Sequence, residues 1–216
     1  MNTERINLVD LKNLTIALLL YLPYLFIVKS HFNTQKKTEQ KTEQSHRHPL
    51  AAATVVDDDG AICSGCEFRL SGAAYKCTKP KCEFHLHELC FTLPPEIHHP
   101  SHPKHPLILV GSPPYVGGEF ACDACGDVGS GFIYRCPRCQ FDLHIHCAAL
   151  PETVAGKNHD HPLRLEFQSK GKGFSCGVCE GGFGNGCWVY YCGVCDLGVH
   201  IHCFVAEDED EDEDIE

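Results

Sequence analysis

Apolar positions along the chain fall into one long run and several short ones. The long run covers residues 14–28 and reads LTIALLLYLPYLFIV. Three short stretches surround Tyr75, Tyr134 and Tyr190, and each is followed two residues later by a cysteine. Such short runs, rich in aromatic and β-branched residues, are typical of strands. Because Gly, Pro and Asp fill much of the remainder, we expect small, loop-rich and mostly β modules.

A second set of short apolar runs leads into a recurring His-x2-Cys element. The runs are residues 84–86, 141–143 and 197–199, and the histidine follows each of them directly. We expect the His-x2-Cys element to begin one short helix in each copy.

The long apolar run leaves three interpretations open: a membrane anchor, a signal peptide cleaved near Ser30, or a buried start of the chain. As a helix, residues 14–28 span about 22 Å, less than the roughly 30 Å core of a bilayer. Basic residues are more frequent after the run than before it. The positive-inside rule therefore favours an anchor with the modules in the cytoplasm, and secretion after cleavage is the alternative. Residues 1–30 form this segment and residues 31–45 a polar linker.

Cysteine and histidine recur in one order three times. The clearest copy reads Cys122-x2-Cys125-x10-Cys136-x2-Cys139-x4-His144-x2-Cys147. The other copies begin at Cys63 and Cys176, and together the three place fifteen of the sixteen cysteines, leaving Cys187. A repeat of this kind indicates tandem modules. We place them at residues 46–98, 99–158 and 159–206.

Zinc explains this pattern better than disulfides do. Each copy has a histidine followed by Pro-Leu before its first cysteine: His48, His105 (or the nearby His102) and His161. Disulfides have no use for histidines at fixed spacing, whereas a tetrahedral zinc site takes thiolate and imidazole together. Modules of this size also bury too little apolar surface to be stable without such a constraint.

The net charge of −11 is concentrated at one end of the chain. Of the 29 acidic residues, nine lie in residues 207–216, and without them the balance of 18 basic against 20 acidic residues is close to neutral. The body therefore lacks the basic surface that nucleic-acid binding requires. We expect the acidic tail to be disordered, because its charges repel one another.

In this order of groups, residues 46–205 resemble the divergent C-one domain family of plant cysteine/histidine-rich proteins. Its modules are related to the diacylglycerol-binding zinc domain of protein kinase C. The resemblance implies two interleaved zinc sites per module. One site would join the first cysteine pair to the late His-Cys pair. These sets are Cys63, Cys66, His87 and Cys90; Cys122, Cys125, His144 and Cys147; and Cys176, Cys179, His200 and Cys203.

The resemblance implies that the other site takes the upstream histidine, the second cysteine pair and one downstream group. The third module has no cysteine or histidine after Cys203, so its second site is expected to have three protein ligands or to be empty. The chain is thus expected to hold five or six zinc ions. The sets are His48, Cys77, Cys82 and His98; His105, Cys136, Cys139 and His159; and His161, Cys192 and Cys195.

The function we predict is that of a zinc-binding interaction or scaffold protein. By resemblance it acts on protein partners in plant intracellular signalling or stress responses, with no catalytic residue and no cofactor besides zinc. An alternative is a thiol-disulfide oxidoreductase, since similar modules occur in plant nucleoredoxin-like proteins and Cys136-Pro137-Arg138-Cys139 resembles a redox pair. The thioredoxin-like βαβ pattern that such a pair needs is not visible.

Lipid binding at a membrane surface is a further alternative. The lipid-binding relatives carry a Gln-Gly pair where this chain has Phe132-Ile133 in the second module. If exposed, these two residues and Trp188 could insert into a membrane or a partner's groove, although apolar residues of this size more often pack in a core.

Overall fold

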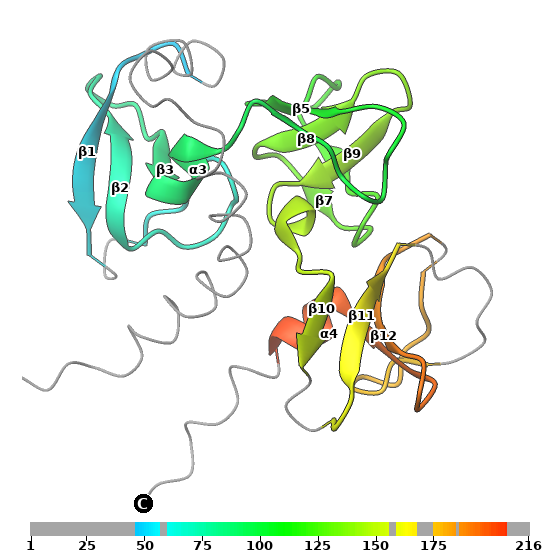
Figure 1. Ribbon diagram of the computed structural model, residues 1–216. Coiled ribbons are helices and arrows are strands. Elements are labelled where there is room, and N and C mark those ends of the chain that lie inside the picture. Colours follow the sequence, from blue (N-terminus) through cyan, green and yellow to red (C-terminus); the bar gives the residue numbers. More distant parts are fainter. Residues whose placement is uncertain (1–45, 57–59, 156–158, 168–174, 185, 207–216) are drawn as a thin grey trace, which may run out of the picture.

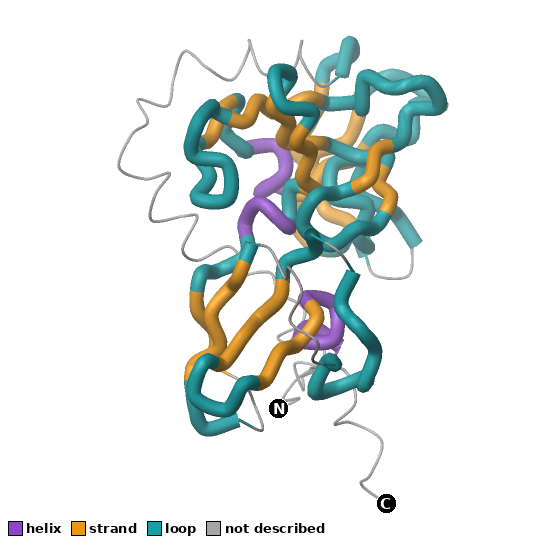
Figure 2. Tube along the Cα trace, turned by 90° about the vertical axis from the view of Figure 1, so that its right-hand side faces the viewer, coloured by secondary structure: helices purple, strands orange, loops and turns teal. Residues whose placement is uncertain are grey.

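The computed structural model describes residues 46–56, 60–155, 159–167, 175–184 and 186–206. Three small antiparallel sheets follow one another along this part of the chain, coloured from cyan through green to orange in Figure 1. The helical segments between them have six residues or fewer. The prediction of mostly β modules with short helices is therefore confirmed, and Figure 2 shows how much of the chain is loop.

The membrane prediction needs correction. No helix within the described ranges is long and apolar enough to cross a bilayer. We therefore withdraw the transmembrane anchor and the cytoplasmic placement of the modules that depended on it. The apolar run at 14–28 itself lies outside the described residues, as do the polar linker at 31–45 and the acidic tail at 207–216.

The first sheet has three strands in the order β1-β2-β3. These are Leu50–Val55 (β1), Gly72–Cys77 (β2) and His85–His87 (β3). The helix α3 (Glu88–Thr92) begins directly after the histidine of the His-x2-Cys element. Two of its strands therefore end at a candidate metal ligand: β2 ends at Cys77 and β3 ends at His87.

The second and third sheets have four strands each and share one arrangement. Each begins with a short edge strand taken from the chain just after the helix of the preceding module. Short helices, η2 (Cys147–Ala149) and α4 (Ile201–Ala206), again follow the last strands. The second sheet contains Glu96–Ile97 (β4), Leu107–Val110 (β5), Ile133–Cys136 (β8) and Phe141–His144 (β9). The third contains Thr153–Ala155 (β10), Pro162–Glu166 (β11), Val189–Cys192 (β12) and Leu197–His200 (β13).

A smaller two-stranded ribbon completes the second module. It pairs Phe120–Ala121 (β6) with Val128–Gly129 (β7) on either side of the first cysteine pair. The ribbon therefore closes the loop that carries Cys122 and Cys125.

The tyrosines that marked the predicted strands lie in β2, β8 and β12. Tyr134 and Tyr190 are almost fully buried. Their hydroxyls donate to the carbonyl oxygens of Pro94 (2.8 Å) and Pro151 (3.0 Å), in the segments that connect successive modules. Burial of a phenol requires such a partner. Each tyrosine thus fixes the connecting segment on the core of its own module.

Left-handed backbone turns close the cysteine pairs. Glu67 and Glu180 follow the first pair of their modules with φ of 65° and 59°, and Gly126 does so in the second module with φ of 83°. This conformation costs a non-glycine residue roughly 1–2 kcal/mol. We attribute its recurrence to the tight turn that brings two cysteine sulfurs to one point.

Candidate metal centres

Three inner clusters, defined as the first cysteine pair of a module with its late His-Cys pair, are assembled by the fold. Their members are Cys63, Cys66, His87 and Cys90; Cys122, Cys125, His144 and Cys147; and Cys176, Cys179, His200 and Cys203. In the first two, the ligand atoms all lie within 4.8 Å of one another. In the third, Nδ1 of His200 lies 3.4 Å from Cys179 Sγ and 3.7 Å from Cys203 Sγ. The structure thus brings together the sets that the resemblance implied.

The distances within the inner clusters fit a tetrahedral ion. Zinc bonds of about 2.3 Å to sulfur and about 2.0–2.1 Å to nitrogen place a sulfur and a nitrogen about 3.6 Å apart. The distance from His87 Nδ1 is 3.3 Å to Cys66 Sγ and 3.9 Å to Cys90 Sγ. His144 lies at 3.4 and 3.9 Å from its two partners. The donor set, three sulfurs and one nitrogen, is one that zinc commonly takes.

The orientation of the cluster histidines is set by their second ring nitrogen. Nε2 of His87 lies 3.1 Å from the carbonyl oxygen of Arg69, and Nε2 of His200 lies 3.3 Å from that of Gly182. A carbonyl can only accept, so Nε2 carries the proton and Nδ1 presents its lone pair to the sulfurs. This outer hydrogen bond is the arrangement that zinc-binding histidines usually have.

The electrostatics of the inner clusters favour thiolate at one cysteine in each. Hydrogen bonds from neighbouring thiols, first that of Cys66, hold the pKa of Cys63 well below its ordinary value. Hydrogen bonds from the thiols around Cys122, first that of Cys125, likewise hold the pKa of Cys122 well below its ordinary value. Burial alone would raise the pKa of Cys176, but backbone N–H groups at Cys179 and His200 bring it to about 6. Thiolate is the form that binds zinc.

Three outer clusters combine the second cysteine pair with two upstream histidines. They are His46, His48, Cys77 and Cys82; His102, His105, Cys136 and Cys139; and His159, His161, Cys192 and Cys195. In the first, Nε2 of His46 lies 3.3 Å from Cys77 Sγ and 3.4 Å from Cys82 Sγ. In the other two, the second histidine lies 3.3 Å from Cys139 or Cys195.

The outer clusters differ from the implied sets in one ligand each. His98 is exposed and directly follows β4, which belongs to the second sheet, and His46 stands in the first cluster instead. His159 joins the third module, and His102 takes the place expected for it in the second. The third outer cluster therefore has four candidate protein ligands, where the sequence predicted three ligands or an empty site.

A signal for the missing ligand was present in the sequence. A second histidine precedes the His-Pro-Leu histidine by two residues in the first and third modules and by three in the second. The pair stands just before β1, β5 or β11, and each of these strands lies beside the strand that ends in the second cysteine pair. Strand pairing thus brings both histidines to the outer site.

Orphaned ring nitrogens support metal binding at the outer clusters. Nε2 of His102 and Nε2 of His159 are buried and have no hydrogen-bond partner among the described residues. A buried polar atom without a partner is costly and calls for an explanation, and ligation by zinc supplies one. The imidazole of His159 also lowers the pKa of the neighbouring Cys192 thiol to about 7, which favours the thiolate that zinc needs.

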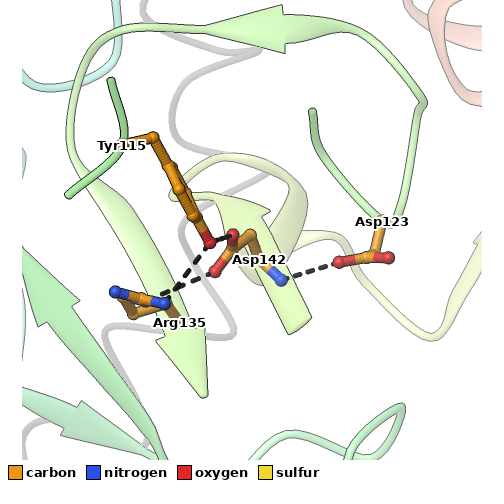
Figure 3. Close-up of polar contacts among 4 residues, drawn as sticks. All are labelled: Tyr115, Asp123, Arg135 and Asp142. Carbon is orange, nitrogen blue, oxygen red and sulfur yellow. Dashed lines mark hydrogen bonds and ion pairs between the residues drawn. The ribbon is translucent and has the colours of Figure 1, made fainter. Parts of the chain in front are cut away.

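A polar network braces the inner cluster of the second module (Figure 3). Asp142, 5% exposed, accepts a hydrogen bond from the Tyr115 hydroxyl and lies 3.6 Å from the Arg135 guanidinium. Its backbone N–H donates to Asp123 Oδ2 (2.7 Å), and the Asp123 N–H donates to the Asp142 carbonyl (2.8 Å). Asp123 lies inside the first cysteine pair and Asp142 two residues before His144, so the network fixes two parts of the metal site to each other.

The residues considered for membrane insertion are not exposed. Phe132, Ile133 and Trp188 are 3%, 0% and 2% exposed. All sixteen cysteines lie within the described residues and are free thiols. Cys136 and Cys139, the pair that resembles a redox motif, stand in an outer cluster with two histidines. The residues considered for membrane insertion are thus buried, and the cysteine pair considered for redox chemistry lies in a candidate metal cluster.

Comparison with known proteins agrees with this geometry. A family model described as the C1 domain matches residues 100–148 and 157–204, which carry the second and third modules. The chain is also similar to probable nucleoredoxin 1 of Arabidopsis thaliana, with 31% identity over 94 residues. That match covers 44% of this chain and 14% of the relative, so the chain spans about one seventh of that protein's length. No solved structure matches the chain.

Proposed function

We propose that the chain is a zinc scaffold holding six zinc ions, two in each of three modules; the match of the C1 domain model to residues 100–148 and 157–204 supports this. The observation that carries the proposal is the set of outer clusters, in which every module supplies two upstream histidines to its second cysteine pair. The first module lies outside the matched segments, but its two clusters have the same residue types in the same order.

The role of zinc in this proposal is structural. Each inner ion closes a long loop of a module that has only a small sheet of its own, and structural zinc contributes up to about 10–16 kcal/mol per site in small fingers. With four protein ligands at each cluster, no coordination position remains for a substrate, which is the mark of a structural rather than a catalytic zinc. We therefore assign the chain to protein–protein interaction, in plant signalling or stress responses by family resemblance.

Disulfide reduction is the second candidate, and one observation favours it: the similar protein is named a probable nucleoredoxin. The observations on this chain weigh against it, because the Cys136 and Cys139 thiols share a cluster with two histidines. Turnover of a disulfide substrate by the zinc-loaded chain would reverse this preference.

Zinc counting under reducing conditions tests the proposal. Native mass spectrometry and elemental analysis should give six zinc ions per chain and sixteen thiols after denaturation with a chelator. Three or fewer ions, or thiols lost to disulfides, would overturn it.

Two histidine variants test the ligand assignment. His46→Ala should lower the count by one zinc or weaken zinc binding at that site at least tenfold, because it removes one of four ligands. His98→Ala is the matched control and should keep all six, since His98 is exposed and outside the cluster. The opposite result would restore the ligand set implied by family resemblance.

A further inference from the structure

The contacts between successive modules follow one rule. The backbone N–H of Phe132, in the second module, donates to the carbonyl of Gly65 in the first at 2.8 Å. The N–H of Trp188, in the third module, donates to the carbonyl of Ala124 in the second at 2.7 Å. Gly65 and Ala124 occupy the same position, two residues after the first cysteine of their module. Phe132 and Trp188 likewise correspond, each two residues before the strand tyrosine.

The acceptor peptide also faces the inner cluster. The N–H of Gly65 points at Cys63 Sγ (3.4 Å), and that of Ala124 at Cys122 Sγ (3.4 Å). One residue therefore donates its N–H to a cluster sulfur and offers its carbonyl to the next module. The shape of this surface depends on the cysteine turn that the metal site closes.

Side chains complete both contacts. Phe132 directly precedes β8 and Trp188 directly precedes β12. Both side chains are buried, and both backbone N–H groups contact the preceding module. At the first contact, the backbone N–H of Ser130 donates to the Glu67 carboxylate (3.0 Å). At the second, His99 stacks on Trp188 with ring centroids 5.3 Å apart, and Cys187 Sγ lies 3.6 Å from the Cys125 carbonyl oxygen.

The small size of the residues at the contact is required by the close approach. A Cβ on Gly131 would lie 2.4 Å from the Gly65 carbonyl oxygen and 3.0 Å from Glu67 Cγ, both in the first module. A Cβ on Gly65 would lie 3.3 Å from the Phe132 ring. Ala124 is fully buried. Larger side chains on either partner would separate the two backbones.

The first module lacks the aromatic donor residue of this contact, and the third module lacks the small acceptor residue. In the first module, Ala73 stands where Phe132 and Trp188 stand, and it is paired with Thr54 of β1. In the third module, Val178 stands where Gly65 and Ala124 stand, and it is 40% exposed. The aromatic residue is thus present only in modules with a described predecessor, and the small residue only in modules with a described successor.

We propose that the first cysteine turns of the first and second inner clusters are docking surfaces whose partner is the next C1-type module, so that the three modules stack as one directional array. The donor half of the contact is an aromatic residue two positions before the strand tyrosine. This inference rests on the proposed zinc sites, because the docking surface is the metal-binding turn itself. It assigns to Phe132 and Trp188 a role in assembling the scaffold.

Gly131→Ala in the full chain is the sharpest test, because every close contact of the added methyl group lies across the first interface. The amide protons of Phe132 and Ser130 should exchange at least tenfold faster than in the wild type, and the radius of gyration by small-angle scattering should rise. Gly182→Ala is the control, since nothing lies within 4 Å of its added Cβ. Wild-type exchange in Gly131→Ala would overturn the proposal.

The second interface supplies an independent variant. Trp188 is the only tryptophan, so its fluorescence reports on this contact alone. Ala124→Val should shift the emission to longer wavelength, as the indole becomes exposed to water. Val178→Ala, at the corresponding and partly exposed position of the third module, should leave the emission unchanged. An unshifted Ala124→Val spectrum, or an equal shift in both variants, would contradict the docking rule.

Zinc content separates this inference from the proposed function. It is counted in every variant, and only variants with the wild-type number are compared. A wild-type chain without zinc would overturn the proposed function. A wild-type chain with six zinc ions whose Phe132 amide exchanges at the rate of an exposed amide would overturn the array alone.

Discussion

The inner and outer clusters use the same two side-chain types but differ in how the chain surrounds them. Inner clusters take three cysteines and one histidine, and in the first two modules three of the four ligands are buried. Outer clusters take two of each, and none of the ligands of the first outer cluster is fully buried. Burial and sulfur content therefore change together.

The difference has a topological cause. An inner cluster joins the first cysteine turn, which lies in the connection between two strands of the sheet, to the end of the last strand and the short helix after it, so it encloses the core. An outer cluster joins the entry of one strand to the end of its neighbour, and it needs only local pairing. The inner site should therefore hold the module together, while the outer site fastens one edge of the sheet.

A pair of cysteine variants in the second module tests this comparison with the largest expected effect. Cys147→Ala removes a ligand from the inner cluster and should unfold the module, because the loss of a structural zinc worth about 10 kcal/mol exceeds the stability of a domain this small. Cys139→Ala should cost the outer zinc only and leave the sheet folded. Hydrogen exchange with zinc counting measures both.

The result that contradicts the comparison is equal unfolding by the two variants. It would mean that the outer site also encloses the core. Cys187→Ala controls for the loss of a thiol in the zinc count alone, because Cys187 lies outside the clusters described above while its Sγ contacts the Cys125 carbonyl oxygen.

Removal of zinc by a chelator should sharpen the comparison further. We expect the outer ions to leave before the inner ions, because Cys139 and Cys195 are exposed and their clusters hold fewer thiolates. The third inner cluster should fall between the two groups, since its Cys179 is exposed as well. A chelator titration followed by native mass spectrometry would show the order, and a single phase for all ions would rule it out.

How far the sequence could predict these sites depends on the distance between their ligands. The residues of the inner sets, grouped as the family resemblance implied, lie together in the structure, since the cysteine spacing and the His-x2-Cys element place them in two short segments of each module. The tyrosine strands were predicted for the same reason. The residues that form these turns and strands are close together in the sequence, so local patterns are sufficient to predict them.

The fourth residue of each outer cluster was not predicted, although a second upstream histidine recurs in each module. His98 follows the first module's late cysteine at a suitable spacing, but the chain has by then crossed into the second sheet through β4. The spacing between Cys90 and His98 does not show that β4 pairs with the second sheet, and this pairing takes His98 away from the first module. Packing of Phe132 and Trp188 was expected as the commoner case, but the surface that covers them could not be predicted, because it belongs to another module.

Two glycine-to-alanine variants compare how tightly the chain packs around an inner and an outer cluster. A Cβ on Gly129 would lie 2.4 Å from Nε2 of His144. Gly129→Ala should therefore displace the imidazole and weaken the inner site, at a cost of about 1–3 kcal/mol in the free energy of unfolding. Gly193→Ala, inside the third outer pair, meets only Tyr191 at 3.9 Å and should be close to neutral. Thermal unfolding at saturating zinc measures both, and equal loss would show that outer sites are packed as tightly.

The smallest expected difference in unfolding free energy concerns two tyrosine hydroxyls, one near an inner cluster and one near an outer cluster. Tyr115 bonds the buried Asp142, which in turn holds the inner turn through Asp123. Tyr115→Phe should cost about 1.5–3 kcal/mol, the range for a hydrogen bond to a charged group, because it leaves a buried carboxylate short of a partner.

Tyr191→Phe is the matched variant, since Tyr191 bonds Asp196 beside the outer cysteine Cys195 at the surface. There water replaces the lost partner, so the change in unfolding free energy should stay below about 1 kcal/mol. Chemical denaturation of the zinc-loaded chain resolves the two values. A Tyr191 effect as large as that of Tyr115 would show that the outer sites, despite their exposure, depend equally on their polar surroundings.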